Sequence, residues 1–264
     1  MSPFFFGTSK RRLFGVYHPP RASRGGERAV VLCAPWGHEY IYAHRSMARL
    51  AITLAEAGFH VLRFDYYGTG DSGGNSTDVD LAGCRADIGM AIDELLDMSG
   101  AERVSLIGLR LGAALAVEVA ATERGRIDQL VLWDPVIAGP EYVTALFKAA
   151  LNMPIGLADP RTISAARGGD HEICGFPLTE VQRREIAGID ILPFLPKLPK
   201  RWFALVTQPL GSHDALRSAL GGIESRDDPH FEQIEDCAAW HENWPQNAGN
   251  VPTDVIARIG AWMT

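Results

Sequence analysis

Short apolar runs alternate with stretches of helical periodicity along the first half of the chain. Strands are predicted at residues 4–6, 12–18, 29–34, 59–65, 104–108 and 129–134, the first two joined as a hairpin. Helices are predicted at residues 45–57, 80–98 and 111–122. A strand at 202–207, a last strand at 231–235 and a closing helix at 252–263 complete the pattern. Strands that alternate with helices in this way indicate a parallel sheet with right-handed crossovers.

Residues 139–200 follow a different pattern. Their helical stretches are short and are repeatedly interrupted by prolines. We interpret this region as a cap inserted over the carboxyl edge of the sheet. The 264 residues then form a single domain that carries its own lid.

The segment 103–116 is typical of a nucleophile elbow, in which a buried strand, a turn bounded by glycines and a helix follow one another. The motif G-x-S-x-G is here Gly108-Leu109-Arg110-Leu111-Gly112. An arginine therefore occupies the position of the nucleophile. Because a guanidinium is always charged and has no lone pair with which to attack, the motif predicts the fold without its usual covalent chemistry.

Four segments carry a resemblance to one superfamily: RLFGVYHPP at 12–20, LRFDYYGTGDS at 62–72, the elbow at 108–112 and LWDP at 132–135. With them the chain resembles the α/β-hydrolases, and among these the serine-aminopeptidase-like branch that includes the exosortase-A-associated hydrolases. An arginine in a GLRLG-type elbow is not unique to this chain in that branch. The resemblance implies the α/β-hydrolase fold, a mostly parallel central sheet with helices on both faces and a helical cap. It covers the first half well, whereas the cap and the C-terminal third match only in layout.

In such a fold the acid of a catalytic triad follows a late strand and the histidine lies near the end of the chain. Asp214 and His241 occupy those places and are 27 residues apart, enough for one helix and one strand. The pair could act as a dyad in which the acid orients the imidazole and the imidazole acts as base. Asp134 is an alternative acid. The competing interpretation is that Asp214 caps a helix and His241 lies in a surface loop.

Backbone N–H groups of Leu111 and of Trp36 or Gly37 are the candidate oxyanion hole, because they follow the elbow residue and the strand at 29–34. Two interpretations of Arg110 remain open. It anchors an anionic part of a substrate through its guanidinium fork, or it pairs internally with an acid such as Asp65, Asp71 or Asp134.

Other reactive side chains are less favoured. Glu39 and His38 are expected to pair locally rather than to catalyse. Ser72 belongs to a turn that knits a loop, and the thiol of Cys33 lies in a buried strand where it stays protonated. The group His171, Glu172 and Cys174 has no second ligand pair at metal-binding spacing, so neither a metal nor a cofactor is predicted.

Composition limits the partners. With 25 Lys and Arg against 32 Asp and Glu, the net charge is −7, which argues against nucleic acid or an anionic membrane as the main partner. The sequence contains no apolar run long enough to span a membrane, and its N-terminal apolar stretch is too short for a signal peptide. Four widely spaced cysteines favour free thiols and a cytoplasmic location. The sequence leaves a homodimer open.

These observations favour an enzyme that hydrolyses a small acyl ester or thioester. His241, oriented by Asp214, would activate water, and Arg110 would hold a charged part of the substrate. Two alternatives use the same fold differently. The dyad could serve a lyase or cyclase, or the chain could be a catalytically silent relative that binds an anionic ligand or joins an assembly as a partner subunit.

Overall fold

The computed structural model describes residues 1–21, 27–151, 171–207, 209–220, 231–237, 240 and 250–264. Its main sheet has eight strands in the order β1-β2-β4-β3-β5-β6-β9-β10. The strands are β1 (Ser2–Gly7), β2 (Arg12–His18), β3 (Ala29–Cys33), β4 (His60–Phe64), β5 (Val104–Leu109), β6 (Ile127–Trp133), β9 (Arg201–Val206) and β10 (Phe231–Gln233). The pairs β1–β2 and β2–β4 are antiparallel and all other pairs are parallel. The predicted parallel sheet with an N-terminal hairpin is confirmed.

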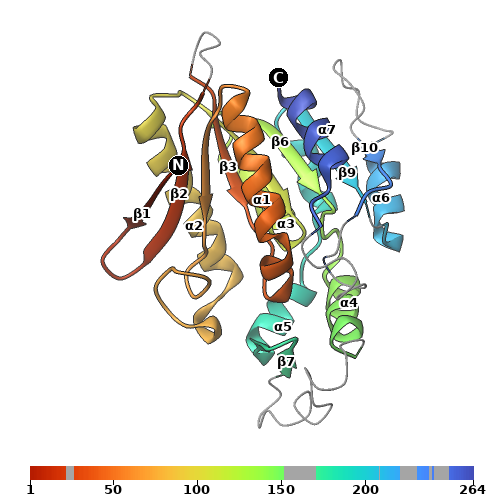
Figure 1. Ribbon diagram of the computed structural model, residues 1–264. Helices are drawn as coiled ribbons and strands as arrows, with labels where there is room; N and C mark the ends of the chain where they lie inside the picture. The colour runs from red at the N-terminus through yellow and green to blue at the C-terminus, as the bar shows by residue number, and fades with distance from the viewer. Residues whose placement is uncertain (22–26, 152–170, 208, 221–230, 238–239, 241–249) are drawn as a thin grey trace.

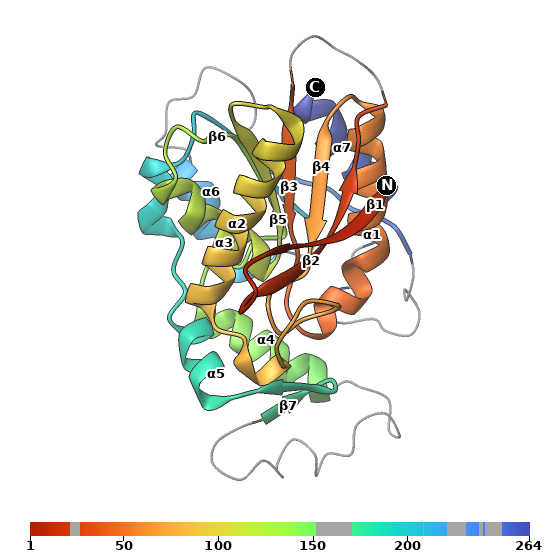
Figure 2. The ribbon, with the colours of Figure 1, turned by 90° about the vertical axis from the view of Figure 1, so that its left-hand side faces the viewer.

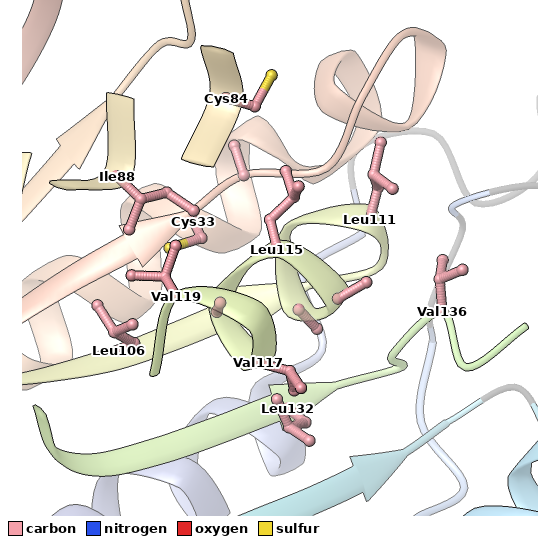
Figure 3. Close-up of a cluster of buried hydrophobic side chains, with 14 of the residues drawn as sticks. Cys33, Cys84, Ile88, Leu106, Leu111, Leu115, Val117, Val119, Leu132 and Val136 are labelled. Atoms are coloured by element: carbon pink, nitrogen blue, oxygen red, sulfur yellow. The ribbon is translucent and has the colours of Figure 1, made fainter. Parts of the chain in front are cut away.

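Helices cover both faces of the sheet. The helices α1 (His38–Glu56) and α7 (Thr253–Met263) lie on one face, and α2 (Leu81–Ser99) and α3 (Leu111–Thr122) lie on the other (Figures 1 and 2). Strands β3 and β5 are buried along their whole length, which explains why β3 is continuously apolar and β5 carries only one polar residue, Ser105, instead of alternating. Figure 3 shows how α3 fills its layer. Leu115 and Val119 of this helix lie beside Ile88 of α2, and Val117 lies beside Leu132 of β6.

The main error in the predicted elements concerns α1, which begins at residue 38 rather than at residue 45. Its first turn buries His38 and Glu39, and its apolar buried face begins only at Ala43. Because the buried side of this turn is polar, hydrophobic periodicity gives no sign of a helix there. The turn that was missed carries a residue of the candidate site.

The region 139–200 contains α4 (Gly139–Leu151), the hairpin β7 (His171–Ile173) and β8 (Phe176–Leu178), α5 (Glu180–Ala187) and the 3₁₀ helix η2 (Leu192–Lys197). Helices α4 and α5 and strand β7 lie together at the end of the molecule that the carboxyl ends of β3, β5 and β6 face (Figures 1 and 2). The 3₁₀ helix η1 (Ser76–Asp78) and α6 (Gly211–Leu220) complete the described elements. Within the described ranges, every helix is too short or too polar to span a bilayer.

Candidate active site

The elbow between β5 and α3 has the backbone geometry that the sequence predicts. Arg110 stands at its tip with φ 55° and ψ −119°, a region that costs a non-glycine residue about 1–3 kcal/mol. A Cβ on Gly108 would lie 2.4 Å from the Cα of Ala113, and a Cβ on Gly112 would lie 2.3 Å from the carbonyl oxygen of Cys33. Both glycines are therefore required by close backbone contact, whichever residue occupies the tip.

The Arg110 side chain is fully buried and paired with an acid. Its Nε donates to Oε1 of Glu39 at 3.0 Å, and Nη1 donates to the backbone carbonyl of Asp134 at 3.2 Å. The hydroxyl of Tyr142 donates to Oε2 of Glu39 at 2.7 Å, and the ring of Tyr142 lies 5.3 Å from the guanidinium carbon. Residues from α1, the elbow and α4 thus meet in one buried cluster of Glu39, Arg110 and Tyr142, here called the elbow cluster.

Charge compensation stabilises the elbow cluster. Burial lowers the pKa of Arg110, but the charges of Glu39, Tyr142 and Asp134 and the hydrogen bond to Glu39 together outweigh this effect, so the net pKa is raised. Burial, followed by the charge of Glu39, raises the pKa of Tyr142 well above its ordinary value, so its hydroxyl remains a donor. The structure therefore contains the internal ion pair that was one of the two interpretations of Arg110. Its acid is Glu39 from the helical turn that hydrophobic periodicity missed.

Asp134, at the end of β6, connects this strand to Thr207, which follows β9, and to Trp240. Its carboxylate accepts hydrogen bonds from the backbone N–H of Thr207 at 2.6 Å and from the Thr207 hydroxyl. It also accepts one from the indole Nε1 of Trp240 at 2.8 Å. Trp240 immediately precedes His241, which lies outside the described residues. The alternative acid is therefore in contact with the chain next to the candidate base.

Asp214 lies in the first turn of α6, and 83% of its side chain is exposed. Its nearest cationic partner is Arg217, with 3.9 Å between Nη1 and Oδ1. The neighbouring residue His213 is buried instead. Its Nδ1 accepts from the N–H of Leu210 at 2.8 Å, so Nε2 carries the proton and donates to the Pro135 carbonyl at 3.0 Å. Burial lowers the pKa of His213, which keeps this imidazole neutral.

Because Asp214 is exposed and Asp134 is buried, Asp134 is the acid that lies nearer the interior of the carboxyl edge. The pairing of either acid with His241 stays a prediction, because that histidine lies outside the described residues.

The groups predicted for an oxyanion hole lie at the carboxyl edge. Leu111 is the first residue of α3, and Gly37 precedes α1 with φ 63°. Trp36 and Leu111 are both buried. A Cβ on Gly37 would lie 3.8 Å from the Cβ of Phe176, so the β7–β8 hairpin lies directly against this loop. The use of these N–H groups in catalysis stays a prediction.

The loop that contains Asp65 and Ser72 agrees with the structural role expected of it. The Ser72 hydroxyl donates to the Asp65 carbonyl at 2.6 Å and accepts from the N–H of Phe14 at 2.8 Å, so it is engaged in holding the loop. Burial raises the pKa of the Cys33 thiol, which keeps it protonated. No three His, Cys, Asp or Glu side chains of the described ranges gather as metal ligands would.

The chain is similar to proteins of known family and structure. Residues 27–165 match the family described as serine aminopeptidase, S33. No curated protein matches the chain.

Several solved structures share the fold. Est1E from Butyrivibrio proteoclasticus, in a structure with bound ferulic acid, is 17% identical with a TM-score of 0.70, over 98% of this chain and 97% of that one. The esterase Pf2001 from Pyrococcus furiosus is 16% identical with a TM-score of 0.63, over 99% and 91%. XC6422 from Xanthomonas campestris, described as an α/β serine hydrolase without lid, is 14% identical with a TM-score of 0.60, over 99% and 93%. These likenesses confirm the predicted fold class.

Proposed function

Because the chain belongs to the serine aminopeptidase S33 family, we propose that it is a hydrolase of acyl esters or thioesters that forms no covalent acyl-enzyme. The observation that carries this proposal is the residue at the tip of the elbow. Arg110 keeps the backbone geometry of a nucleophile while its side chain, buried against Glu39, has no lone pair to offer. Attack on the carbonyl carbon is then left to water.

The proposed reaction uses His241 as general base. The imidazole removes a proton from water as the water oxygen bonds to the carbonyl carbon. The N–H groups of Leu111 and of Trp36 or Gly37 then donate to the developing oxyanion. When the tetrahedral intermediate collapses, the bond to the alkoxide or thiolate breaks and the imidazolium returns the proton to that leaving group. General-base catalysis of this kind accelerates a reaction by about 10²–10⁴, so slow turnover is expected.

The acid that orients the base is proposed to be Asp214 or Asp134. The sequence order supports Asp214, whereas burial and contact with Trp240 support Asp134. Asp134 already accepts three hydrogen bonds, which fix the position of its carboxylate at the end of β6. The substitutions Asp214→Asn and Asp134→Asn separate the two choices, because only the true partner should alter the pH dependence of turnover.

Two further roles are proposed. Arg110 would contact an anionic group of the substrate, sharing its guanidinium with Glu39, and residues 139–200 would act as the cap over the site. The position of α4 and α5 beyond the carboxyl ends of the strands supports the cap (Figures 1 and 2). The hydrogen bond from Tyr142 of α4 to Glu39 supports a cap that is tied to the elbow cluster.

A second candidate function is a catalytically silent module that binds an anionic ligand or a partner. The observation that favours it is the complete burial of both Arg110 and Glu39, which leaves the guanidinium satisfied by the protein itself. Under this alternative no residue of the carboxyl edge needs to act as a base.

Panels of short acyl esters and acyl thioesters, assayed with purified protein, test the proposal. The wild type should hydrolyse at least one substrate, and His241→Ala should lower kcat by at least about 10². His44→Ala, at an exposed histidine of α1, is the control and should retain turnover. Activity that persists in His241→Ala overturns the assigned base. Absence of activity in the wild type over both panels favours the silent module.

A fluorophosphonate probe tests the absence of a covalent intermediate. The wild type should remain unlabelled, because neither Arg110 nor the engaged hydroxyl of Ser72 is an activated nucleophile. Labelling of any side chain, located by mass spectrometry, would overturn the mechanism.

A further inference from the structure

A hollow that none of the elbow-cluster residues lines lies between α1, the strands β2 and β4 and the loop that follows β4. Its apolar walls include Val16 of β2 and Met47 of α1, and its polar lining includes Arg63, Asp65 and Asp71. Arg63 of β4 is the register partner of Val16 of β2, so the two side chains leave the sheet on the same face, and both line this hollow. This set is here called the Arg63 groove.

The Arg63 guanidinium is partly buried and forms no ion pair with a described acid. Its Nε donates to Nε2 of His18 at 3.3 Å. Burial, followed by the charge of Arg63, lowers the pKa of His18 to about 4, so this acceptor is neutral at physiological pH. No acid of the described ranges lies within 4.0 Å of the guanidinium nitrogens of Arg63, and its terminal Nη groups donate to none of the described side chains or carbonyls.

The acids that share the groove are used differently. Both carboxylate oxygens of Asp65 are occupied, Oδ1 by the hydroxyl of Tyr40 at 2.6 Å and Oδ2 by the N–H of Asp71 at 3.0 Å. The side chain of Asp71 is exposed at the rim. These two negative charges lower the electrostatic potential of the groove without contacting the guanidinium, so a dianion is disfavoured there relative to a monoanion.

We propose that the Arg63 groove binds a small organic monocarboxylate, whose two oxygens accept hydrogen bonds from the Nη groups of Arg63 while its short hydrocarbon body lies against Val16 and Met47. A planar fork that retains unused donors is suited to bidentate carboxylate recognition. Apolar walls with a few polar groups are the usual composition of a small-molecule site. The site uses neither Arg110 nor the proposed base, so its failure and the failure of the proposed hydrolase are separate outcomes.

Isothermal titration of the full chain with butyrate at pH 8 tests the site, with inorganic phosphate, which is mostly a dianion at that pH, as the second probe. Wild type should bind butyrate saturably, and Arg63→Gln should weaken that binding at least tenfold. Arg63→Lys, which keeps the charge and loses the fork, should weaken it several-fold. Arg49→Gln removes an exposed arginine of α1 and is the matched control; it should bind butyrate as the wild type does. If Arg63→Gln does not fold, the comparison of Arg63→Lys with wild type decides alone.

Selectivity supplies the second readout. Wild type should bind phosphate at least several-fold more weakly than butyrate, and Asp71→Asn should reduce that difference because it removes one negative charge from the rim. The hydrogen bond from the backbone N–H of residue 71 to Asp65 survives this substitution. Butyrate binding that is absent in wild type, or unchanged in Arg63→Gln or Arg63→Lys, overturns the proposal. Phosphate bound as tightly as butyrate overturns the assignment to a monocarboxylate.

Discussion

Separating the two charges of the elbow cluster should cost far more stability than removing both. Arg110 and Glu39 each have a side-chain exposure of 0%, and 3.0 Å separates Nε from Oε1. The substitution Glu39→Gln retains an oxygen that can accept from Tyr142 but leaves a buried cation. The substitution Arg110→Met leaves a buried carboxylate. A broken buried pair typically costs about 3–5 kcal/mol, whereas replacing both partners is often neutral.

The nearby carboxylate of Asp134 also favours the charged form of Arg110. This carboxylate partly compensates the cation left by Glu39→Gln. The free energy of unfolding should therefore fall by about 3 kcal/mol in Glu39→Gln and by at least that much in Arg110→Met. The double variant should lose less than about 2 kcal/mol, which gives a coupling energy of at least about 4 kcal/mol. For a chain of this size a loss of about 3 kcal/mol lowers the melting temperature by roughly 6–12 °C.

Urea unfolding of wild type, both single variants and the double variant, at one pH, measures this coupling. The exposed pair Arg21–Glu56, with 3.3 Å between Nη1 and Oε1, is the matched control. The corresponding double-mutant cycle, Glu56→Gln with Arg21→Met, should give a coupling energy of less than about 1 kcal/mol. A coupling energy below about 1 kcal/mol for the elbow cluster as well would refute the argument that these charges depend on each other.

The same reasoning governs any attempt to restore a serine nucleophile. Arg110→Ser alone leaves Glu39 as a buried carboxylate that has lost the cation of its ion pair. We therefore expect Arg110→Ser/Glu39→Gln to be better folded than Arg110→Ser, and any gain in esterase activity to be larger in the double variant. Equal stability of the two variants would contradict this expectation.

Three further predictions concern stability. Because folding lowers the pKa of His18 from 6.5 to about 4, the unfolded chain binds that proton more tightly. The free energy of unfolding should therefore fall as pH drops from 6.5 towards 4, and His18→Gln should reduce this pH dependence in urea unfolding. Gly112→Ala drives a Cβ to 2.3 Å from a backbone oxygen of β3 and should cost about 3 kcal/mol or more, whereas Gly89→Ala, with nothing within 4 Å, should leave the melting temperature unchanged or raised. Trp240→Phe removes the 2.8 Å hydrogen bond to Asp134 and should cost about 1.5–3 kcal/mol; an unchanged urea midpoint would show that this bond does not hold the segment.

Local sequence patterns were sufficient to predict most of the fold. The apolar run of β3 and the alternation of strands with helices depend on simple periodicity, and the glycines of the elbow belong to a short motif; each appears in the structure as predicted. The arginine at the tip of the elbow was likewise evident from the motif alone, together with the consequence that it cannot attack a carbonyl carbon.

The partner of that arginine was decided only by the tertiary structure. Glu39 is 71 residues from Arg110 along the chain and Tyr142 is 103 residues from Glu39, yet both are buried in the elbow cluster. A polar residue that is buried because a distant charge compensates it looks, in the sequence, like any exposed polar residue. Periodicity records which side chains avoid water, whereas the identity of a buried ion pair depends on which elements the folded chain brings together.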